Sequence, residues 1–481
     1  MIIHFFIMHD ESPSSSSSSS SPSPAPSPSP SPSSDTPSPS RPVTQGAPGQ
    51  ESGPKKWHNN DRQRRGGRRV RAQRRPFPRK DRRNDRPALP SQGYSNQSNL
   101  EANFIPLATT DPNAEPTFAE GIVELSGKGF GFLREARRSY AASQNDIFVT
   151  SEIIRTFNLR DGVCIKGETR RGQRGWQLFR LTEIEGENPE KFSNIPLFEE
   201  LTTISPTERI ILETVPERYT TRIIDLMSPI GKGQRGLIVA PPRTGKTTLL
   251  QHIADAVIKN HPTMKLIILL IDERPEELTE MRRTFPQAEL YASSNDCDLK
   301  SHTHIAQLAI DRAKRLVEQG KDVFVLMDSL TRIGRAFNNS MASGGRTMSG
   351  GIDARAMEIP RKLFAAARNT EEAGSLTIIA SALIETNSRM DELIFQEFKG
   401  TGNMELVLDR KISEQRIYPA VDIFLSGTRR EELLLPEEDL HKINIIRRGL
   451  AGHKPIEAIE RILSFIRRHP TNADVLANIP G

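Results

Sequence analysis

The stretch GLIVAPPRTGKTTLL, residues 236–250, joins an apolar strand, a proline-rich turn and the start of a helix. This order is typical of a P-loop, in which the turn points backbone N–H groups at nucleotide phosphates, a lysine reaches the outer phosphates and a hydroxyl holds magnesium. Lys246 and Thr247 stand where those two side chains are needed. Ala240 replaces the first glycine of the GxxxxGK(S/T) pattern, so a chance helix start remains an alternative until a second nucleotide-binding element is found.

Two further apolar strands supply that second element, because each ends in an acid. Met264–Ile271 leads into Glu273, and Val323–Asp328 ends in an aspartate. Ligands of open parallel sheets bind beyond the carboxyl ends of the strands, so Glu273 is placed to polarise a water at the γ-phosphate. Asp328 can hold Mg²⁺, partly through water. Together with the P-loop, these acids predict an ATPase with a RecA-like α/β core.

Composition divides the chain into a folded part and a front part that cannot fold alone. The 481 residues are only 35% hydrophobic, and residues 11–50 are almost all Ser, Pro, Gly and polar residues, which predicts disorder. Residues 51–87 contain 15 Lys or Arg and four acids, net +11, so the rest of the chain carries about −5 of the total of +6. This arginine-rich block is either a non-specific RNA contact or a solvated basic linker.

Cysteine content and hydropathy limit the compartment. Cys164 and Cys297 are too few and too far apart for a disulfide framework or a zinc site, which fits a reducing cytosol. No apolar run approaches the length that spans a bilayer, and the longest, Leu266–Ile271, suits a buried parallel strand. We therefore expect a cytoplasmic protein without a membrane anchor.

The texture of the sequence changes at Thr117, where short β-type runs separated by Gly, Asn and Asp predict a small antiparallel barrel. Within it, Phe130 and Phe132 occupy alternate positions and so share one face of a strand. That face is either core or a platform on which nucleic-acid bases stack. The surrounding basic residues and a third aromatic on the next run favour the platform; they are Lys128, Arg134, Arg137, Arg138 and Phe148.

The order of these motifs resembles the transcription termination factor Rho family of bacteria. GFGFLR and DIFV are similar to the cold-shock-type OB domain of that family, and GQRG, APPRTGKT, IDERPEE, MDSLTR, FKGTGN and SGTRR follow in the family's order. The family itself carries Ala-Pro-Pro at Ala240. The resemblance covers roughly residues 117–468; in front of it, the usual helical N-terminal subdomain is replaced by Ser/Pro-rich and Arg-rich sequence. The predicted fold is a RecA-like P-loop ATPase core preceded by a small OB-type β-barrel and a disordered N-terminal extension.

Composition and motif order together predict a domain division: a disordered extension over 1–115, an OB-fold RNA-binding domain over 116–185, a linker over 186–220, expected to be extended because it contains Pro189, Pro196 and Pro206, and the ATPase domain with C-terminal helices over 221–481.

The resemblance assigns roles to individual residues. Catalytic roles fall to Glu273, Asp328, the finger arginine Arg429 from a neighbouring subunit and the supporting Arg416. Nucleotide contacts fall to Gly231, Lys232, Gly233, Gln234, Arg235, Gly236, Arg243, Thr244, Gly245, Lys246, Thr247, Thr248, Arg274 and Tyr418, the last stacking on adenine, with Thr247 and Asp328 serving Mg²⁺. Primary RNA contacts fall to Gly129, Phe130, Gly131, Phe132, Leu133, Arg134, Asp146, Ile147, Phe148, Arg174, Gly175 and Trp176. Contacts in a central channel fall to Thr347, Met348, Ser349, Gly350, Gly351 and Arg389, where the family usually has a lysine.

The resemblance implies a homohexameric, ATP- and Mg²⁺-dependent RNA translocase or helicase. It would bind single-stranded nascent RNA, terminate transcription by dissociating the RNA polymerase complex, and meet elongation factors as partners. Two alternatives stay open: a RecA-fold rotary or export ATPase, and an RNA chaperone with a non-catalytic P-loop.

Deleting residues 51–87 distinguishes the two interpretations of the arginine-rich block. If the block contacts RNA phosphates, its loss flattens the slope of RNA affinity against salt concentration, because fewer counterions are released on binding. The measurement is a titration of single-stranded RNA at several salt concentrations with the full chain and the deletion variant. An identical slope for the two proteins would identify the block as a solvated linker.

Overall fold

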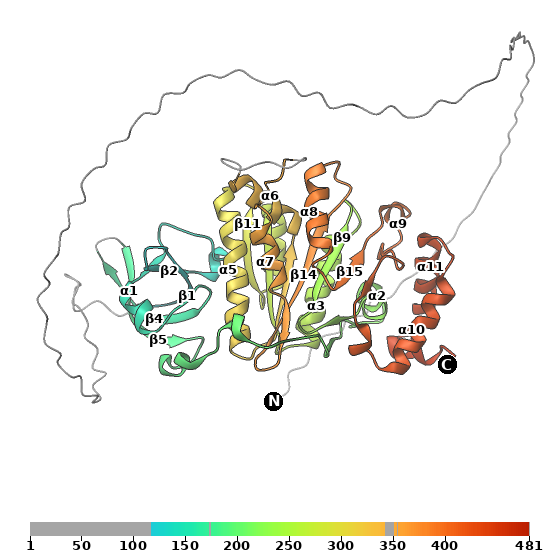
Figure 1. Cartoon of the computed structure of the whole chain (residues 1–481), viewed down its shortest axis with the longest axis horizontal. Coiled ribbons are helices and arrows are strands. Elements are labelled where there is room, and N and C mark those ends of the chain that lie inside the picture. The colour runs from blue at the N-terminus through green and yellow to red at the C-terminus, as the bar shows by residue number, and fades with distance from the viewer. Residues whose placement is uncertain (1–116, 173–174, 342–350, 354, 481) are drawn as a thin grey trace, which may run out of the picture. The chain divides into compact units, whose positions relative to one another are not determined.

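The computed structural model describes residues 117–172, 175–341, 351–353 and 355–480. The predicted N-terminal extension, and therefore the arginine-rich block, lies outside the described residues. Within them, no helix is long and apolar enough to cross a membrane. Two architectures follow each other along the chain, a β-barrel and an α/β sheet (Figure 1).

The first architecture is a closed barrel with the strand order β1-β2-β3-β5-β4. Alternate residues of these strands point inward, and Val123, Leu133, Val149, Ile165 and Leu178 form its core. The predicted OB-type barrel is therefore confirmed. The barrel consists of β1 (Thr117–Leu125), β2 (Gly131–Arg134), β3 (Ile147–Val149), β4 (Cys164–Gly172) and β5 (Gly175–Ile184), with η1 (Ala136–Arg138) and α1 (Ser151–Thr156) between strands.

The second architecture is a mostly parallel sheet with the order β11-β10-β12-β14-β9-β15-β16. Only the edge strand β16 on this path runs antiparallel to its neighbour. The short β13 (Arg368–Thr370) adds an antiparallel pair to β14. The strands of the main path are β9 (Arg235–Ala240), β10 (Lys265–Glu273), β11 (Glu289–Ser294), β12 (Val323–Asp328), β14 (Ser375–Leu383), β15 (Met404–Val407) and β16 (Gly427–Thr428).

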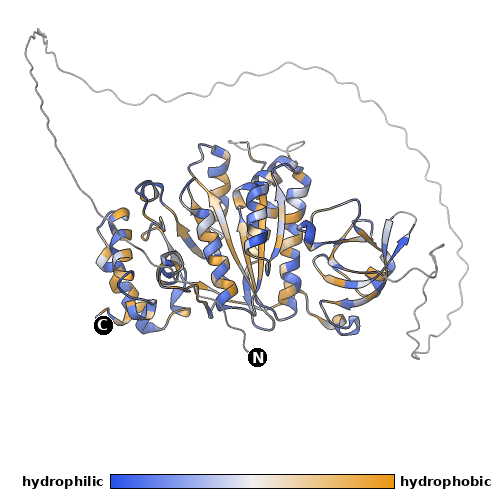
Figure 2. Cartoon of the chain, turned by 180° about the vertical axis from the view of Figure 1, so that it is seen from behind, coloured by the Kyte–Doolittle hydropathy of each residue, from blue (hydrophilic) through white to orange (hydrophobic). Residues whose placement is uncertain are grey.

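Helices cover both faces of this sheet, which explains why its strands are apolar without alternation. In β9, Ile238 and Ala240 face one core, and Leu237 and Val239 face the other. Figure 2 shows hydrophobic residues concentrated on the central strands, whereas the helices carry both colours. One core is completed by α2 (Tyr219–Met227), α3 (Lys246–Asn260), α4 (Pro275–Thr284), α9 (Arg410–Glu414), α10 (Glu437–Leu450), α11 (Pro455–Ile466) and α12 (Asn472–Ala477), and the other by α5 (Leu299–Glu318), α6 (Leu330–Met341), α7 (Glu358–Ala365) and α8 (Arg389–Lys399).

The segment between barrel and sheet differs from the predicted extended linker because it is packed. Phe198 is fully buried, and Leu201 lies in the same hydrophobic core. Two of its short strands also pair with the ATPase part, β6 (Thr203–Ile204) with β13 and β7 (Arg209–Ile210) with β8 (Ile230–Gly231). The remaining short elements are η2 (Pro189–Asn194), η3 (Phe198–Glu200) and η4 (Glu431–Leu433).

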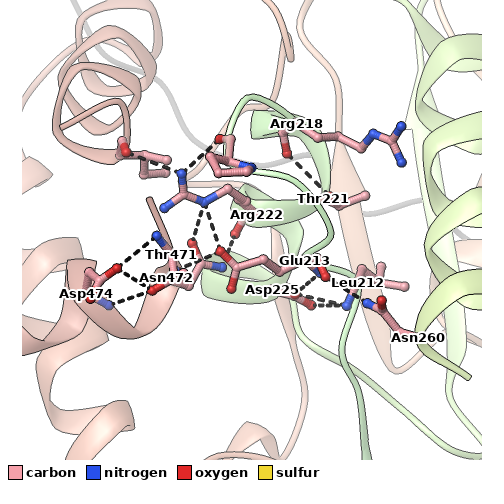
Figure 3. A network of polar contacts seen from close by, with 12 residues as sticks. Leu212, Glu213, Arg218, Thr221, Arg222, Asp225, Asn260, Thr471, Asn472 and Asp474 are labelled. Atoms are coloured by element: carbon pink, nitrogen blue, oxygen red, sulfur yellow. Dashed lines mark hydrogen bonds and ion pairs between the residues drawn. The ribbon is translucent and has the colours of Figure 1, made fainter. Parts of the chain in front are cut away.

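A buried arginine attaches the C-terminal helix to the start of the ATPase part. Arg222 of α2 is 0% exposed, and its Nε donates to Asn472 Oδ1 at 3.2 Å and lies 3.2 Å from Glu213 Oε1 (Figure 3). Asn472 returns a hydrogen bond from Nδ2 to the Arg222 carbonyl at 3.0 Å. A buried guanidinium is costly unless it is paired and hydrogen-bonded, so Asn472 stabilises this part of the fold together with Glu213 and the Pro216 and Ile466 carbonyls.

Replacing Asn472 with alanine removes an acceptor from this buried charge. The free energy of unfolding should fall by about 1–3 kcal/mol, which lowers the melting temperature by roughly 2–6 °C. Thermal denaturation followed by circular dichroism measures the change. Asn478→Ala is the control, because Asn478 is exposed and, among the described residues, bonds only within its own helix end and to His469. Equal melting temperatures for wild type and Asn472→Ala would contradict the assigned role.

Candidate nucleotide and RNA sites

The turn between β9 and α3 has the geometry of a phosphate loop. Arg243 and Gly245 both have positive φ, at 68° and 84°, and α3 begins at Lys246. Backbone N–H groups at such a turn and helix start converge on one point and attract anions. Thr244 is buried, and its hydroxyl donates to the Pro241 carbonyl at 2.8 Å, so it braces the loop from inside. Thr247 is half-buried, and Thr248 is exposed.

The two predicted acids lie at the carboxyl ends of neighbouring strands, at the same edge as the P-loop. Asp328 forms an ion pair with Lys246 and accepts a hydrogen bond from the Ser381 hydroxyl at 2.7 Å. Glu273 is 4% exposed, and one of its carboxylate oxygens, Oε2, has no partner among the described residues. Lys246, Thr247, Glu273 and Asp328 therefore belong to one site.

The charge of Glu273 is controlled by its surroundings. Burial raises the pKa of Glu273, the neighbouring Asp328 carboxylate raises it further, and the Arg332 guanidinium opposes both. Arg332 of α6 lies 3.1 Å from Glu273 Oε1. Sequence reasoning missed the roles of Arg332 and Ser381; Arg332 lies in the MDSLTR motif, whereas nothing in the sequence distinguishes Ser381.

Tyr418 lies against the P-loop, where an adenine ring can stack. A β-carbon built on Gly245 would be 3.5 Å from Cδ1 and Cε1 of the tyrosine, and Tyr418 is 43% exposed. Arg416, two residues earlier, is exposed and has a positive φ of 61°. Arg274 is exposed at the start of α4, next to Glu276 and Glu277 in the first turn of that helix. The roles predicted for Tyr418, Arg416 and Arg274 stay predictions.

The GQRG loop consists of residues 231–236, GKGQRG. This loop and Arg429 lie at the end of β9 opposite to the P-loop. The loop enters β9 at Arg235, whereas the P-loop leaves the strand after Ala240, roughly 17 Å away at 3.3 Å per residue. Arg429 follows β16. Met404 of the neighbouring strand β15 pairs with Thr428 of β16 on one side and with Gly236 at the start of β9 on the other. Within one chain, neither group lines the P-loop site. The sequence-based expectation that the loop borders the nucleotide therefore requires a nucleotide held by another subunit.

The three phenylalanines of the barrel form one surface cluster and are not part of its core. Ring centroids of Phe130 and Phe132 are 5.7 Å apart, those of Phe130 and Phe148 are 5.3 Å apart, and those of Phe132 and Phe148 are 6.0 Å apart. All three residues are partly exposed, whereas Leu133 and Val149 beside them are fully buried. The arrangement is that of a stacking platform.

Several predicted RNA contacts of the barrel have side chains engaged elsewhere. Arg134 is 7% exposed and forms ion pairs with Glu124 and Asp146, which is also buried. Leu133 and Ile147 lie in the barrel core. Gly131 is needed for packing, because a β-carbon there would be 2.8 Å from the Glu124 carbonyl oxygen. The side chains of Leu133 and Ile147 are therefore not presented to a ligand.

The other predicted RNA contacts lie on the hairpin β4–β5 and around α6. Trp176 is 42% exposed beside the exposed Gly175, and Gly129 is exposed before β2; Arg174 lies outside the described residues. Gly351 and Arg389 are exposed. Asn338 of α6 contacts both segments: its Nδ2 donates to the Gly351 carbonyl at 3.0 Å and lies 3.7 Å from the Sδ of Met390, the residue after Arg389. Thr347, Met348, Ser349 and Gly350 lie outside the described residues.

Fold and site together define a RecA-like P-loop ATPase that carries an OB-type barrel. Two family models match the chain: the RNA-binding domain of Rho termination factor over residues 119–190, and the nucleotide-binding domain of the ATP synthase alpha/beta family over residues 220–428. Among solved structures, an ATPase of the type III secretion system of pathogenic bacteria is 25% identical, covers 58% of this chain and 85% of that chain, and has a TM-score of 0.48.

Curated relatives match over both parts. Transcription termination factor Rho of Cereibacter sphaeroides is 49% identical over 74% of this chain and 85% of the relative. The Pseudomonas aeruginosa protein of that name is 50% identical over 77% and 89%, and the Escherichia coli one is 46% identical over 80% and 94%. The chain therefore belongs to the transcription termination factor Rho family.

Replacing Phe130 and Phe132 together with alanine tests the platform. Each lost stack should weaken binding of single-stranded RNA by about 1–3 kcal/mol, measured by fluorescence anisotropy. Phe118→Ala is the matched control, because that ring is 60% exposed on β1 and lies outside the cluster. Unchanged RNA affinity in a double variant with a native circular dichroism spectrum would contradict a binding role for the two rings.

Proposed function

We propose that this protein is an RNA-dependent ATPase that binds nascent RNA and terminates transcription by dissociating the RNA polymerase complex. The observation that carries the proposal is the presence, in one chain of the Rho family, of a partly exposed phenylalanine cluster on an OB-type barrel and of a P-loop beside two strand-end acids. The barrel supplies capture of single-stranded RNA, and the α/β part supplies hydrolysis.

Residues of one subunit prepare ATP for attack by water. Lys246 and the loop N–H groups hold the outer phosphates, and Tyr418 holds the base. Glu273 accepts a proton from the attacking water through its unpartnered oxygen. The Thr247 hydroxyl and the Asp328 carboxylate fit Mg²⁺, which prefers oxygen ligands and keeps several waters. When bound, Mg²⁺ neutralises charge on the phosphates.

The second half of the catalytic site comes from a neighbouring subunit in a homohexamer. Arg429 is exposed and, among the described residues, forms no ion pair, whereas the adjacent Arg430 pairs with Glu432 at 3.4 Å. Because Arg429 is held at the far end of β9, its guanidinium can stabilise a transferring phosphoryl group only in another subunit. Arg416 assists as a γ-phosphate sensor.

Hydrolysis drives translocation along RNA, and the channel contacts around Gly351 and Arg389 hold the strand. Both segments are fixed to α6, Gly351 through Asn338 and the α8 start through the ion pair of Arg335 with Asp391. Movement of α6, which begins two residues after Asp328, would link the nucleotide to the RNA. RNA polymerase and elongation factors in the cytoplasm are the proposed partners, and the domain boundaries given above are part of the proposal, with residues 186–220 as a packed connection.

Two other functions make different predictions. A rotary or export ATPase shares the α/β core, and the match to the ATP synthase alpha/beta model alone does not separate it. The match to the Rho RNA-binding domain over residues 119–190 and the identity to Rho proteins favour termination. An RNA chaperone with a non-catalytic P-loop would bind RNA and not hydrolyse ATP.

ATP hydrolysis with and without C-rich single-stranded RNA, measured alongside particle mass, tests the proposal. RNA should stimulate hydrolysis by a particle with the mass of six chains. Lys246→Ala should lower kcat by about 100-fold or more, since it removes a charge from the phosphates, and should abolish termination in vitro. Lys259→Ala is the control, because Lys259 lies at the other end of α3 and pairs with Asp255.

Each contrary result identifies an alternative. An equal rate of ATP hydrolysis with and without RNA would favour the rotary or export ATPase. Undiminished termination by Lys246→Ala would show that hydrolysis is not required and would favour the chaperone.

A further inference from the structure

Asn403, in the FKGTGN motif that has no assigned role, connects the two segments at the far end of β9. Its backbone N–H donates to the Arg235 carbonyl at 2.9 Å, and its own carbonyl accepts from the Arg429 N–H at 2.9 Å. One residue thus lies between the GQRG loop and the arginine that the proposed function places in a neighbour's catalytic site.

The side chain of Asn403 makes this connection rigid. Its Oδ1 accepts from the Arg235 N–H at 2.9 Å and from Gln234 Nε2 at 2.7 Å. Gln234 is 1% exposed, and its Nε2 also lies 3.2 Å from the Asn403 carbonyl. The loop is packed closely against Asn369, since a β-carbon built on Gly233 would be only 2.2 Å from the Asn369 nitrogen. This close packing leaves the loop little room to shift. The Asn403 amide is therefore anchored to a tightly packed loop.

Other contacts fix the backbone around Arg429 and leave its guanidinium available. The Thr428 hydroxyl donates to the Pro229 carbonyl at 2.7 Å. The Arg235 guanidinium is satisfied by backbone carbonyls, through Nη1 to Ala367 at 3.2 Å and through Nε to Thr401. These carbonyls serve the Arg235 guanidinium in place of a carboxylate, and Arg429 extends from a fixed turn.

We propose that Asn403 is a positioning residue that fixes Arg429 for action on the ATP of the neighbouring subunit. The GQRG loop holds Asn403 in place through the hydrogen bonds from Gln234 and Arg235. The inference rests on the proposed function, which assigns Arg429 to the neighbour's site. An arginine side chain has several rotatable bonds, so its reach is accurate only if its backbone is fixed, and a misplacement of about 1 Å can lower a rate about 100-fold.

The test uses the full-length protein, ATP and single-stranded RNA. Asn403→Ala removes the side-chain acceptor of the Arg235 N–H and one of the two acceptors of Gln234 Nε2, whose contact with the backbone carbonyl of residue 403 remains. We expect kcat to fall about 10- to 100-fold with KM for ATP changed by less than about threefold, because the P-loop site itself is intact. Asn403→Asp keeps the acceptor oxygen and should retain most of the activity. Asn444→Ala, which removes a 3.2 Å hydrogen bond from Arg447 on α10, should match wild type.

A double-variant comparison separates positioning of Arg429 from general stabilisation. If Asn403 acts through Arg429, Asn403→Ala combined with Arg429→Ala is no slower than Arg429→Ala alone. Multiplied defects, an unchanged kcat for Asn403→Ala, or an Asp variant as slow as the Ala variant would overturn the proposal. Particle mass and melting temperature are measured for each variant; if the Ala variant does not assemble, Asn403→Ser carries the same comparison.

The controls distinguish this inference from the proposed function. If wild type hydrolyses ATP with RNA and Arg429→Ala is slow while Asn403→Ala is not, only the positioning role is wrong. If wild type shows no RNA-stimulated hydrolysis, both fail.

Discussion

The length of the buried strand β9 is the constraint on which the arrangement of functional groups depends. Its side chains fill two cores, Ile238 and Ala240 on one side and Leu237 and Val239 on the other, so the strand can neither bend nor slide without exposing apolar surface. The P-loop lies at one end of β9, and Arg235 lies at the other end of the strand. Groups at the two ends of β9 therefore stay roughly 17 Å apart within one chain.

Charge balance at the P-loop end follows from the same parallel sheet. Because β9, β10, β12 and β14 all run in one direction, their carboxyl ends gather Lys246, Glu273, Asp328 and Ser381 although the four lie far apart in the sequence. Asp328 engages the lysine, and Arg332 lies beside Glu273. Glu273 is consequently buried without being left as an isolated charge.

Sequence reasoning located the strand ends well, because a buried parallel strand is a continuous apolar run and the acid after it is conspicuous. For Phe130 and Phe132 it favoured an exposed platform from the surrounding basic residues, because alternate aromatics alone suit either face; the buried positions of Leu133 and Val149 show that the two rings lie outside the core. It grouped Arg134 with the RNA contacts because its ion-pair partners Glu124 and Asp146 are 10 and 12 residues away and are indistinguishable from other acids. Likewise, Asn403 has no signal outside its motif, because its importance arises from three segments that only the sheet brings together.

The bond between Arg222 and Asn472 joins residues 250 positions apart and so has a consequence for synthesis of the chain. When α2 leaves the ribosome, the residue that satisfies its buried arginine has not yet been made. A chain that ends before residue 472 leaves the Arg222 guanidinium without this acceptor inside an apolar core. Packing around this arginine is therefore completed only after residue 472 has been made.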